Sequence, residues 1–411
     1  MKTIYFFKYS IFLILFPALY TVFFPGKIVI VRTLCYLLFL FWFIYIYKKI
    51  PKKEFDTEKS FKFYMWFNAI MYARGSFNIM HWSDYLYFID GLFPAFIFPL
   101  CLYLSSPNNL SQIYKSCMTI GIIMAIINAF YPPTDGMMTM AHNIMWLNIF
   151  IFFYPYIKKK YYFIILIAAF SIISYDFNRR SIMLGYLIPL IILLGFPFLK
   201  NIVIRKCIFY LGALTPIILL VFFTTNKFNI FEFMGEEYSV SIDEKTRQLT
   251  VDSRTGIYKD VTEAIFYSNE WYVPYIGLGG NGKVKTTNNG AASVGFENLR
   301  NGQEAGMLNY IQYGGIWGLI AYGVFLLTAS YKALFKSKND FMIMMGTFLL
   351  FKFLYSFIED TIECNAHTYY HFLWIGMCFN TKLRIMTNQQ IKEWINTVFK
   401  YSNKKTYAYC K

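Results

Sequence analysis

Residues 28–47 read IVIVRTLCYLLFLFWFIYIY, and residues 48–62 continue as KKIPKKEFDTEKSFK. The first stretch is almost entirely apolar and is long enough for a helix to cross the hydrocarbon core of a bilayer. The second stretch carries six Lys, which the positive-inside rule assigns to the cytoplasm. The alternation of an apolar stretch with a basic turn decides the fold, because it recurs along the chain.

The composition of the whole chain has the same character. Of 411 residues, 57% are hydrophobic, 21% are aromatic and only 15% are charged, and the mean hydropathy is +0.41. Soluble domains carry about 25% charged residues, and 45 Phe and 35 Tyr cannot be hidden in one aqueous core. Soluble enzymes, fibrous proteins and disordered chains are therefore excluded. The sequence predicts an all-α, polytopic integral membrane protein.

We predict about twelve membrane-spanning helices. The first resembles a signal peptide, but its apolar run is too long and lacks a clear cleavage site, so we interpret it as an uncleaved span. Helices one to nine lie in residues 1–224, a long loop in 225–305, helices ten to twelve in 306–382, and a tail in 383–411. The spans are approximately 4–24, 28–47, 63–80, 84–104, 113–131, 141–157, 161–177, 181–199, 206–224, 306–330, 341–358 and 367–382.

Lysine and arginine orient these spans. If the N-terminus is cytoplasmic, the basic turns all fall on the cytoplasmic side, whereas four of the alternate loops contain only Lys27 between them. Asn178-Arg179-Arg180 is the one outer loop that breaks the rule. The basic turns are 48–62, 158–160, 200–206, 331–340 and the tail after Leu383, and the four loops are 25–27, 75–83, 132–140 and 359–366.

The long loop, residues 225–305, falls on the outer side and is too long for a connector. It holds 8 Lys/Arg and 11 Asp/Glu, a net charge of −3, whereas the rest of the chain holds 31 Lys/Arg and 12 Asp/Glu, a net charge of +19. The basic excess therefore faces anionic lipid, and we expect no nucleic-acid partner. We predict a helix over residues 261–266, within the run 252–271, and irregular structure over 288–301. Any catalysis outside the bilayer must use this loop.

Residues 277–283, GLGGNGK, match the phosphate-loop pattern G-x-x-x-x-G-K. Val284 follows in place of the Ser or Thr that would bind magnesium, and no strand precedes the motif in a βαβ unit. The loop also lies outside, away from ATP. We therefore reject nucleotide binding, while contact between this backbone and a sugar or lipid phosphate stays open.

Three arginines are candidate phosphate ligands. Arg179 and Arg180 lie where a short outer loop meets the membrane, as a headgroup anchor or, as we favour, as bidentate contacts for a phosphate. Arg254 lies in the long loop, where it either pairs with Asp252 or forms a second phosphate clamp. A lipid that carries a diphosphate would present its phosphates at this depth.

Glu304 directly precedes the tenth span. Its charge suits a helix N-terminus without any chemistry, but as a functional group it could accept the proton of an attacking sugar hydroxyl. Asp135, His142 and Glu297 are the alternatives for that base. Other titratable residues are scattered: none of the seven Cys forms a CxxC pair, and the four His do not cluster. We therefore expect no metal site, disulfide framework or cofactor.

Arg74, Asp90 and Lys352 lie inside predicted spans. A charge in lipid is costly, so each side chain should face the bundle interior or water. We expect them either to pair with each other or to serve function.

The topology, with residues 174–185 and 250–320, resembles the Wzy-type O-antigen polymerases within the O-antigen ligase/polymerase superfamily. The shared features are an outer-facing arginine, Ser253-Arg254 in one late outer loop, a G-x-G stretch at 277–279, and a polar residue before the helix that begins LNYIQYGGIWG (308–318). The resemblance implies a membrane glycosyltransferase similar in plan to the GT-C transferases, with one large periplasmic loop.

In that family the donor is a glycan on an isoprenoid diphosphate, and neither a nucleotide sugar nor a metal is required. The resemblance implies that Arg179 or Arg180 and Arg254 contact the diphosphate, and we assign Arg74 to the same set. Ligases carry a histidine where this chain has Glu304. That difference favours a polymerase and makes Glu304, with Arg254, the catalytic candidate.

We therefore predict an O-antigen polymerase at the periplasmic face of the bacterial inner membrane. It would transfer the growing glycan from undecaprenyl diphosphate to a new lipid-linked repeat unit, with membrane lipids and a chain-length regulator as partners. One alternative is the ligase that moves the glycan to lipid A core. Another is a twelve-span transporter or flippase of the same pathway, although we see none of the internal symmetry that transporters usually show.

Overall fold

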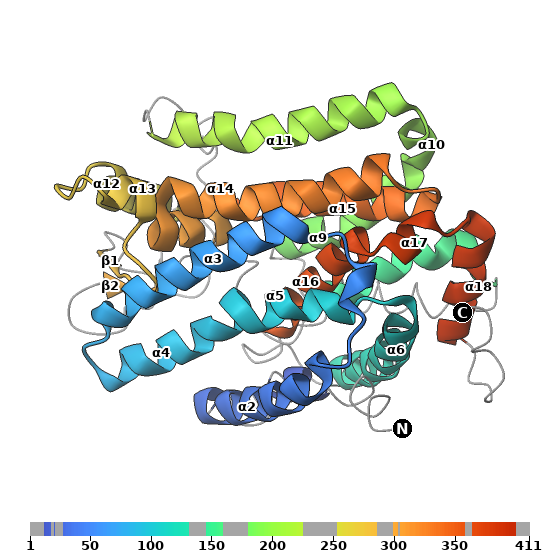
Figure 1. Cartoon of the computed structure of the whole chain (residues 1–411), viewed down its shortest axis with the longest axis horizontal. Helices are drawn as coiled ribbons and strands as arrows, with labels where there is room; N and C mark the ends of the chain where they lie inside the picture. The colour runs from blue at the N-terminus through green and yellow to red at the C-terminus, as the bar shows by residue number, and fades with distance from the viewer. Residues whose placement is uncertain are drawn as a thin grey trace, which may run out of the picture.

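The structure is a computed structural model and is mostly helical (Figure 1). It describes residues 12–17, 20, 28–130, 145–158, 180–224, 253–285, 299–302, 305–357 and 364–399. Two stretches are long and apolar enough to cross a membrane, Asp84–Leu104 and Gly306–Phe335, and Val31–Tyr47 is a shorter apolar helix. The predicted helical, apolar character of the chain is therefore confirmed for these ranges.

Before the long loop, the helical segments are α2 (Ile28–Tyr47), η1 (Lys52–Glu54), α3 (Glu58–Gly75), η2 (Ser76–Asn78), α4 (Trp82–Leu92), η3 (Phe93–Ile97), α5 (Phe98–Leu100), η4 (Cys101–Leu104), α6 (Pro107–Phe130), η5 (Met145–Tyr156), α9 (Arg180–Leu194), α10 (Phe196–Leu199) and α11 (Ile202–Thr224). From the loop onward they are α12 (Ser253–Phe266), α13 (Val273–Ile276), β1 (Val284–Lys285), β2 (Leu299–Arg300), α14 (Gly306–Phe335), α15 (Asp340–Tyr355), α16 (Ala366–Phe379), α17 (Thr381–Ile385) and α18 (Asn388–Phe399).

Predicted and observed helix limits agree best where an apolar stretch is bounded by charge or proline. Helix α2 coincides with the predicted span 28–47, and the unbroken helical run from α4 to η4 coincides with 84–104 to within two residues. The predicted helix over 261–266 lies in α12, which ends at the predicted residue but begins eight residues earlier, at Ser253. The predicted span 161–177 and most of 4–24 lie outside the described residues. The small antiparallel pair of β1 and β2 adds a non-helical element to the predicted all-α fold.

Helix α16 lies at the centre of the bundle, and every one of its residues is buried. Helix α14 packs against α3, α15 and α16, while α11 lies along the outside (Figure 1). Aromatic rings fill the core: Tyr64 stacks on Phe325 at 4.9 Å between centroids, and the Trp374 ring packs edge-on against Phe348 at 5.1 Å. Although α16 carries His367, Thr368 and His371, most of its side chains are apolar or aromatic, which suits burial at the centre of the bundle.

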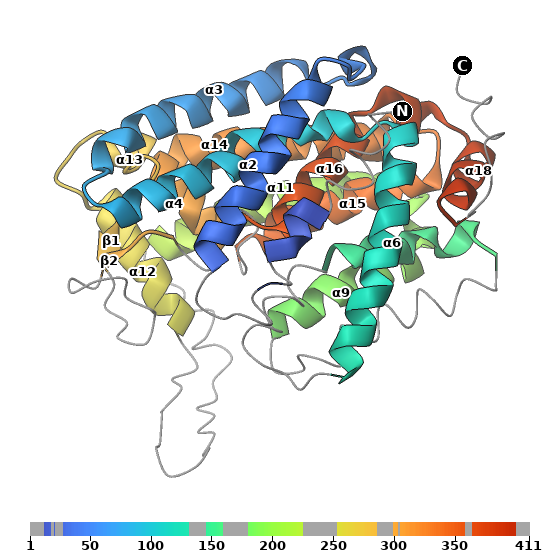
Figure 2. The ribbon, with the colours of Figure 1, turned by 90° about the horizontal axis from the view of Figure 1, so that it is seen from below.

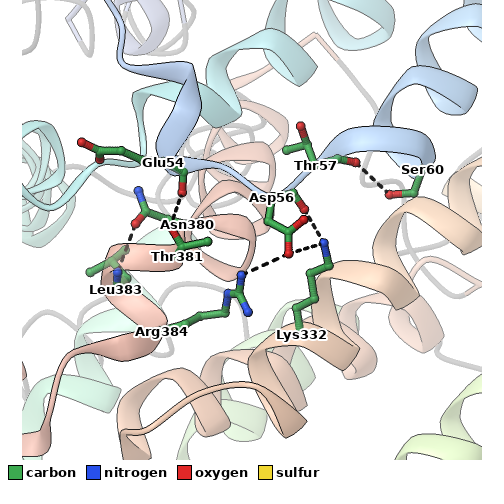
Figure 3. Close-up of polar contacts among 9 residues, drawn as sticks. All are labelled: Glu54, Asp56, Thr57, Ser60, Lys332, Asn380, Thr381, Leu383 and Arg384. Carbon is green, nitrogen blue, oxygen red and sulfur yellow. Dashed lines mark hydrogen bonds and ion pairs between the residues drawn. The ribbon is translucent and has the colours of Figure 1, made fainter.

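The basic turns meet at one end of the bundle. Lys332 at the end of α14 pairs with Asp56 at 2.7 Å, and Arg384 on α17 lies 3.5 Å from the same carboxylate (Figure 3). Lys382 pairs with Glu54 at 2.7 Å. Burial lowers the pKa of the Arg384 guanidinium, and Asp56 acts in the opposite direction. Three connections that are far apart in sequence are thus joined by charge at this end.

The predicted tail, residues 383–411, contains a helix that the sequence analysis did not identify. Helix α18 is amphipathic and buries Ile391, Trp394, Ile395, Val398 and Phe399. The Trp394 indole N–H donates to the Pro107 carbonyl at 2.8 Å, which joins α18 to the start of α6. The helical spacing of these five apolar residues, at i, i+3, i+4, i+7 and i+8, was the signal for this helix.

Candidate functional site

The described part of the long loop packs on the bundle as a small unit with its own core. Its hydrophobic cluster comprises Ile257, Tyr258, Val261, Ile265, Val273, Val284, Ala305, Leu308 and Ile311. The Tyr258 hydroxyl donates to the Phe357 carbonyl, which joins α12 to the end of α15. Helices α12 and α13 and the strand pair lie at the end of the bundle where α3 ends and α4 begins (Figure 2). This end is opposite to the end that carries the basic turns (Figure 1).

Helix α14 bends sharply at Gly315, so the predicted span 306–330 is not one straight helix. Gly315 has φ +60° and ψ −154°, a conformation that only glycine adopts readily. The Tyr310 ring stacks on the Tyr322 ring at 4.3 Å, although twelve residues of straight helix would separate the two by about 18 Å. Residues 306–314 therefore form a short half-helix folded against residues 316–335.

Residues 277–282, called here the glycine segment, fill the break in α14. The Leu278 N–H donates to the Gln312 carbonyl at 2.8 Å and the Gly279 N–H to the Tyr313 carbonyl at 2.9 Å. These are carbonyls that the bend deprives of helical partners. The Gly280 N–H donates to the Met71 carbonyl of α3 at 2.9 Å. Irregular backbone within a helical bundle is tolerated when its polar groups are satisfied in this way.

Glycine is required where these backbones cross. A Cβ on Gly75 would overlap the Gly280 carbonyl, and a Cβ on Gly277 would lie 2.5 Å from the Gly314 nitrogen. Gly277 and Gly279 also have φ values of +66° and +85°. The glycines of the G-x-x-x-x-G-K pattern thus allow close backbone packing between α3, α13 and α14.

This packing removes the donors that a phosphate would need. A phosphate loop binds its ligand with free backbone N–H groups, but the N–H groups of residues 277–280 and of Gly282 donate to protein carbonyls. Lys283, the lysine of the pattern, pairs with the buried Asp84 carboxylate at 2.7 Å. These contacts are consistent with the rejection of nucleotide binding. They also leave the N–H groups of residues 277–280 and of Gly282 no free hydrogen to donate to a sugar or lipid phosphate.

Asp84 holds the start of α4 to the glycine segment. Besides its ion pair with Lys283, its carboxylate accepts from the His81 N–H at 3.1 Å as part of a capping box. Its backbone carbonyl accepts from the Asn281 side chain at 3.1 Å. The sequence analysis did not identify the Asp84–Lys283 pair, because 199 residues of chain separate the two side chains.

Arg74 contacts the glycine segment. Its guanidinium donates to the Ile276 carbonyl at 3.3 Å and also to the Gly277 carbonyl, and it lies 4.7 Å from the centroid of the Tyr272 ring. These contacts stabilise the junction of α3 with α13. The predicted contact between Arg74 and a diphosphate stays a prediction, and the guanidinium would have to exchange carbonyl partners to make it.

The other predicted site residues are only partly described. Arg254 is the second residue of α12, in the unit that packs on α14, and Arg180 is the first residue of α9. Helix α9 packs on η5 and α15. Arg179 and Glu304 lie outside the described residues, as do Asp135, His142 and Glu297. The structure thus joins Arg74 and the helix of Arg254 through the glycine segment and α14.

The expectation that Arg74, Asp90 and Lys352 pair with each other is wrong, because each has a different partner. Asp90 pairs with Arg32 of α2. The Lys352 ammonium lies 3.2 Å from His367 Nε2 and 4.7 Å from the centroid of the Tyr355 ring. Arg32 was the missed signal, since it too is a charge inside a predicted span.

Within the described ranges, no three His, Cys, Asp or Glu side chains converge as metal ligands. Comparisons of the chain with protein-family models, with curated proteins and with solved structures gave no match.

Proposed function

We propose that this chain is an integral membrane glycosyltransferase that polymerises lipid-linked repeat units of a surface polysaccharide. The observation that carries the proposal is that α12, α13 and the glycine segment, all from the long loop, pack against the bent α14. This arrangement holds the helix of Arg254 at the end of the bundle that is opposite to the basic turns. In this proposal the chain is an O-antigen polymerase of the bacterial inner membrane, and its active site lies at the periplasmic face.

Exposed apolar surface supports the membrane part of the proposal. On α2 the outward residues Leu34, Leu38 and Phe41 are exposed, Phe41 by 80%, and on α11 Val203 and Leu211 are exposed. Such surface is costly in water and suits contact with lipid chains. Twelve spans with both termini in the cytoplasm remain the topology that we propose, with the turns in Figure 3 on the cytoplasmic side.

The proposed chemistry needs stabilised charge and a proton acceptor. The glycan is transferred from undecaprenyl diphosphate, which departs with the electron pair of the glycosidic bond while the acceptor hydroxyl loses its proton. Arg254 and the Arg179–Arg180 pair would stabilise the diphosphate, a type of interaction worth about 2.7–4 kcal/mol per donor in other enzymes. Glu304 would accept the proton. A chain-length regulator is the proposed protein partner.

The polysaccharide of a deletion strain tests the proposal. A single repeat unit on lipid A core indicates a polymerase, whereas long lipid-linked chains with no transfer indicate the ligase. In the complemented strain we expect Arg254→Ala to abolish polymer at a normal protein level, and Arg254→Lys to fail too, because a point charge does not replace a bidentate fork. Lys259→Ala, on the exposed side of α12, is the matched control. Wild-type polymer from Arg254→Ala would contradict the role of Arg254.

Glu304 is tested by two substitutions that separate the proton acceptor from the helix charge. Glu304→Gln retains shape and hydrogen bonding but removes the base, so we expect single-repeat glycan. Glu304→Asp retains the carboxylate, so we expect some polymer. If Glu304→Gln makes full-length polymer, the residue stabilises the start of the helix, and the base is elsewhere.

The bend in α14 favours a transporter as the second candidate. Transporters bind substrates at discontinuous helices whose free backbone groups face the ligand. Here the Gln312 and Tyr313 carbonyls at the bend are already bonded to Leu278 and Gly279, which is why we prefer the transferase. A transporter would leave lipid-linked single repeats on the cytoplasmic side of the deletion strain, whereas a missing polymerase would leave them outside.

A further inference from the structure

Arg32 and Asp90 form an ion pair between α2 and α4, inside the bundle. The Arg32 guanidinium donates through Nη2 to Asp90 Oδ2. Arg32 is one helical turn before Tyr36, which is fully buried, so both lie on the inward face of α2. The side chain of Asp90 is 9% exposed and that of Arg32 is 25% exposed. A charged pair in this position is a candidate functional site.

Each partner has a buried atom left over. Asp90 Oδ1 and Arg32 Nε are both shielded from solvent and have no hydrogen-bond partner in the part of the chain that the structure describes. A buried polar atom without a partner loses its hydration without compensation, and most buried polar side-chain atoms in proteins do have one. The ion pair therefore retains one open acceptor and one open donor.

The helix around Asp90 is irregular, and its backbone is nevertheless satisfied. Directly after Leu92, the chain forms the π-helical turn η3, a feature that is frequent at functional sites. The Tyr72 hydroxyl donates to the Gly91 carbonyl at 2.6 Å, and the Asn68 amide donates to the Ala95 carbonyl at 2.8 Å. Helix α3 thus supplies partners for the carbonyls of this turn, while the two atoms of the ion pair stay open.

The charges and the depth of the pair define the ligand. Asp90 and Arg32 neutralise each other, so a phosphate would be repelled by the carboxylate as much as it is attracted by the guanidinium. A neutral hydroxyl fits better, because it donates to Asp90 Oδ1 and accepts from Arg32 Nε. Asp90 is six residues, or about 9 Å of helix, from Asp84 and the glycine segment. In the proposed topology Asp90 lies toward the outer side, from which the sugar of a lipid-linked glycan would approach.

We propose that Arg32 and Asp90 bind a hydroxyl group of the sugar of a lipid-linked glycan. The identification of the ligand as a sugar rests on the proposed function. The unpartnered Asp90 Oδ1 and Arg32 Nε are observed independently of that function. A purely structural ion pair is the competing explanation. The two explanations predict different results for an apolar pair of similar volume. Such a pair often replaces a buried structural ion pair without loss of stability, but it cannot form hydrogen bonds with a sugar hydroxyl.

The decisive variant is Arg32→Met/Asp90→Leu, tested in the full-length protein in nanodiscs. The probe is octyl glucoside below its micelle concentration, and octyl phosphate is the second arm. We expect the glucoside to raise the thermal midpoint of the wild-type protein, and the double variant to need about tenfold or more glucoside for the same rise, since it loses two hydrogen bonds to charged groups. If the double variant accumulates poorly, Arg32→Gln/Asp90→Asn takes its place.

Two outcomes would overturn the inference. An equal response of the wild-type protein and the variant to the glucoside shows that the pair does not bind the hydroxyl. A response of the wild-type protein to octyl phosphate alone shows an anion site. Polymer length in the complemented deletion strain is measured separately, where we expect the double variant to lose polymer at a normal protein level. If the deletion strain retains normal polymer, the proposed function fails while the glucoside result still decides the binding site.

Discussion

Four glycines, Gly75, Gly277, Gly279 and Gly315, allow the backbones of α3, α13 and α14 to approach closely. A side chain at any of them meets main-chain atoms of a neighbouring segment rather than the flexible end of a side chain. The residues that surround this crossing, Arg74 among them, then bond to carbonyls that the crossing brings near. The glycine pattern in the sequence is therefore a packing device in this chain.

At Gly315 we expect alanine to destabilise the protein by about 2 kcal/mol or more. The cost has two sources: the φ of +60° with ψ of −154° is strained for alanine, and the new Cβ would lie 2.5 Å from the Tyr275 carbonyl carbon. The thermal midpoint of the purified protein measures the effect. Gly302→Ala is the control, since its Cβ would make an ordinary 3.5 Å contact with the Tyr313 hydroxyl. Equal thermal midpoints for the Gly315→Ala and Gly302→Ala proteins would contradict the bend of α14 at Gly315.

At Arg74 we expect lysine to lower the stability of the substrate-free protein by about 1–2 kcal/mol. Lysine retains the charge but loses the planar contact with the Tyr272 ring and one of the two carbonyl bonds. The thermal midpoint without lipid-linked substrate measures this loss. An unchanged midpoint combined with loss of polymer would instead support the predicted contact between Arg74 and the diphosphate.

Among the elements, the most informative are those that depart from a simple span. Helix α14 consists of a short half-helix and a long one, and the short one, residues 306–314, has nearly all its side chains buried. Helix α18 lies across the opposite end and packs on α6 and η5. Both elements bury apolar surface against helices that are distant in sequence, and both therefore contribute to the stability of the whole bundle.

Truncation of Trp394 tests the role of α18. We expect Trp394→Ala to cost about 3–5 kcal/mol, the usual range for a buried tryptophan, and it also removes the donor to the Pro107 carbonyl. Lys392→Ala, at an exposed position of the same helix, should change little. Protein level in the membrane and resistance to proteolysis measure the difference. A Trp394→Ala protein as stable as the control would show that α18 does not hold α6.

For the whole molecule, charge separates the two ends. The turns that join α2 to α3, α14 to α15 and α16 to α17 share ion pairs at one end, and the loop unit lies at the other (Figure 1). We expect reporters fused after Lys283 and after Lys405 to lie in opposite compartments, because lysine and arginine next to a span stay cytoplasmic. Activity of both reporters in the same compartment would contradict the proposed topology.

The sequence by itself determined the helical, apolar character of the chain. Apolar length and flanking lysines are local properties, so α2 and the run from α4 to η4 were predicted to within two residues. The predicted helix over 261–266 is the second half of α12, which begins eight residues earlier. The amphipathic pattern of α18 was present in the sequence too, but a charged tail concealed it.

Only the tertiary structure decided what the polar residues do. The glycine pattern at 277–283 suggested a ligand loop, yet its N–H groups are used by α3 and α14 because a bent helix leaves carbonyls that need donors. Arg74 meets Gly277, Lys283 meets Asp84, and Arg32 meets Asp90 across 203, 199 and 58 residues of chain. A buried charge takes the partner that packing brings within reach, and packing depends on the fit of whole helices rather than on neighbours in the sequence.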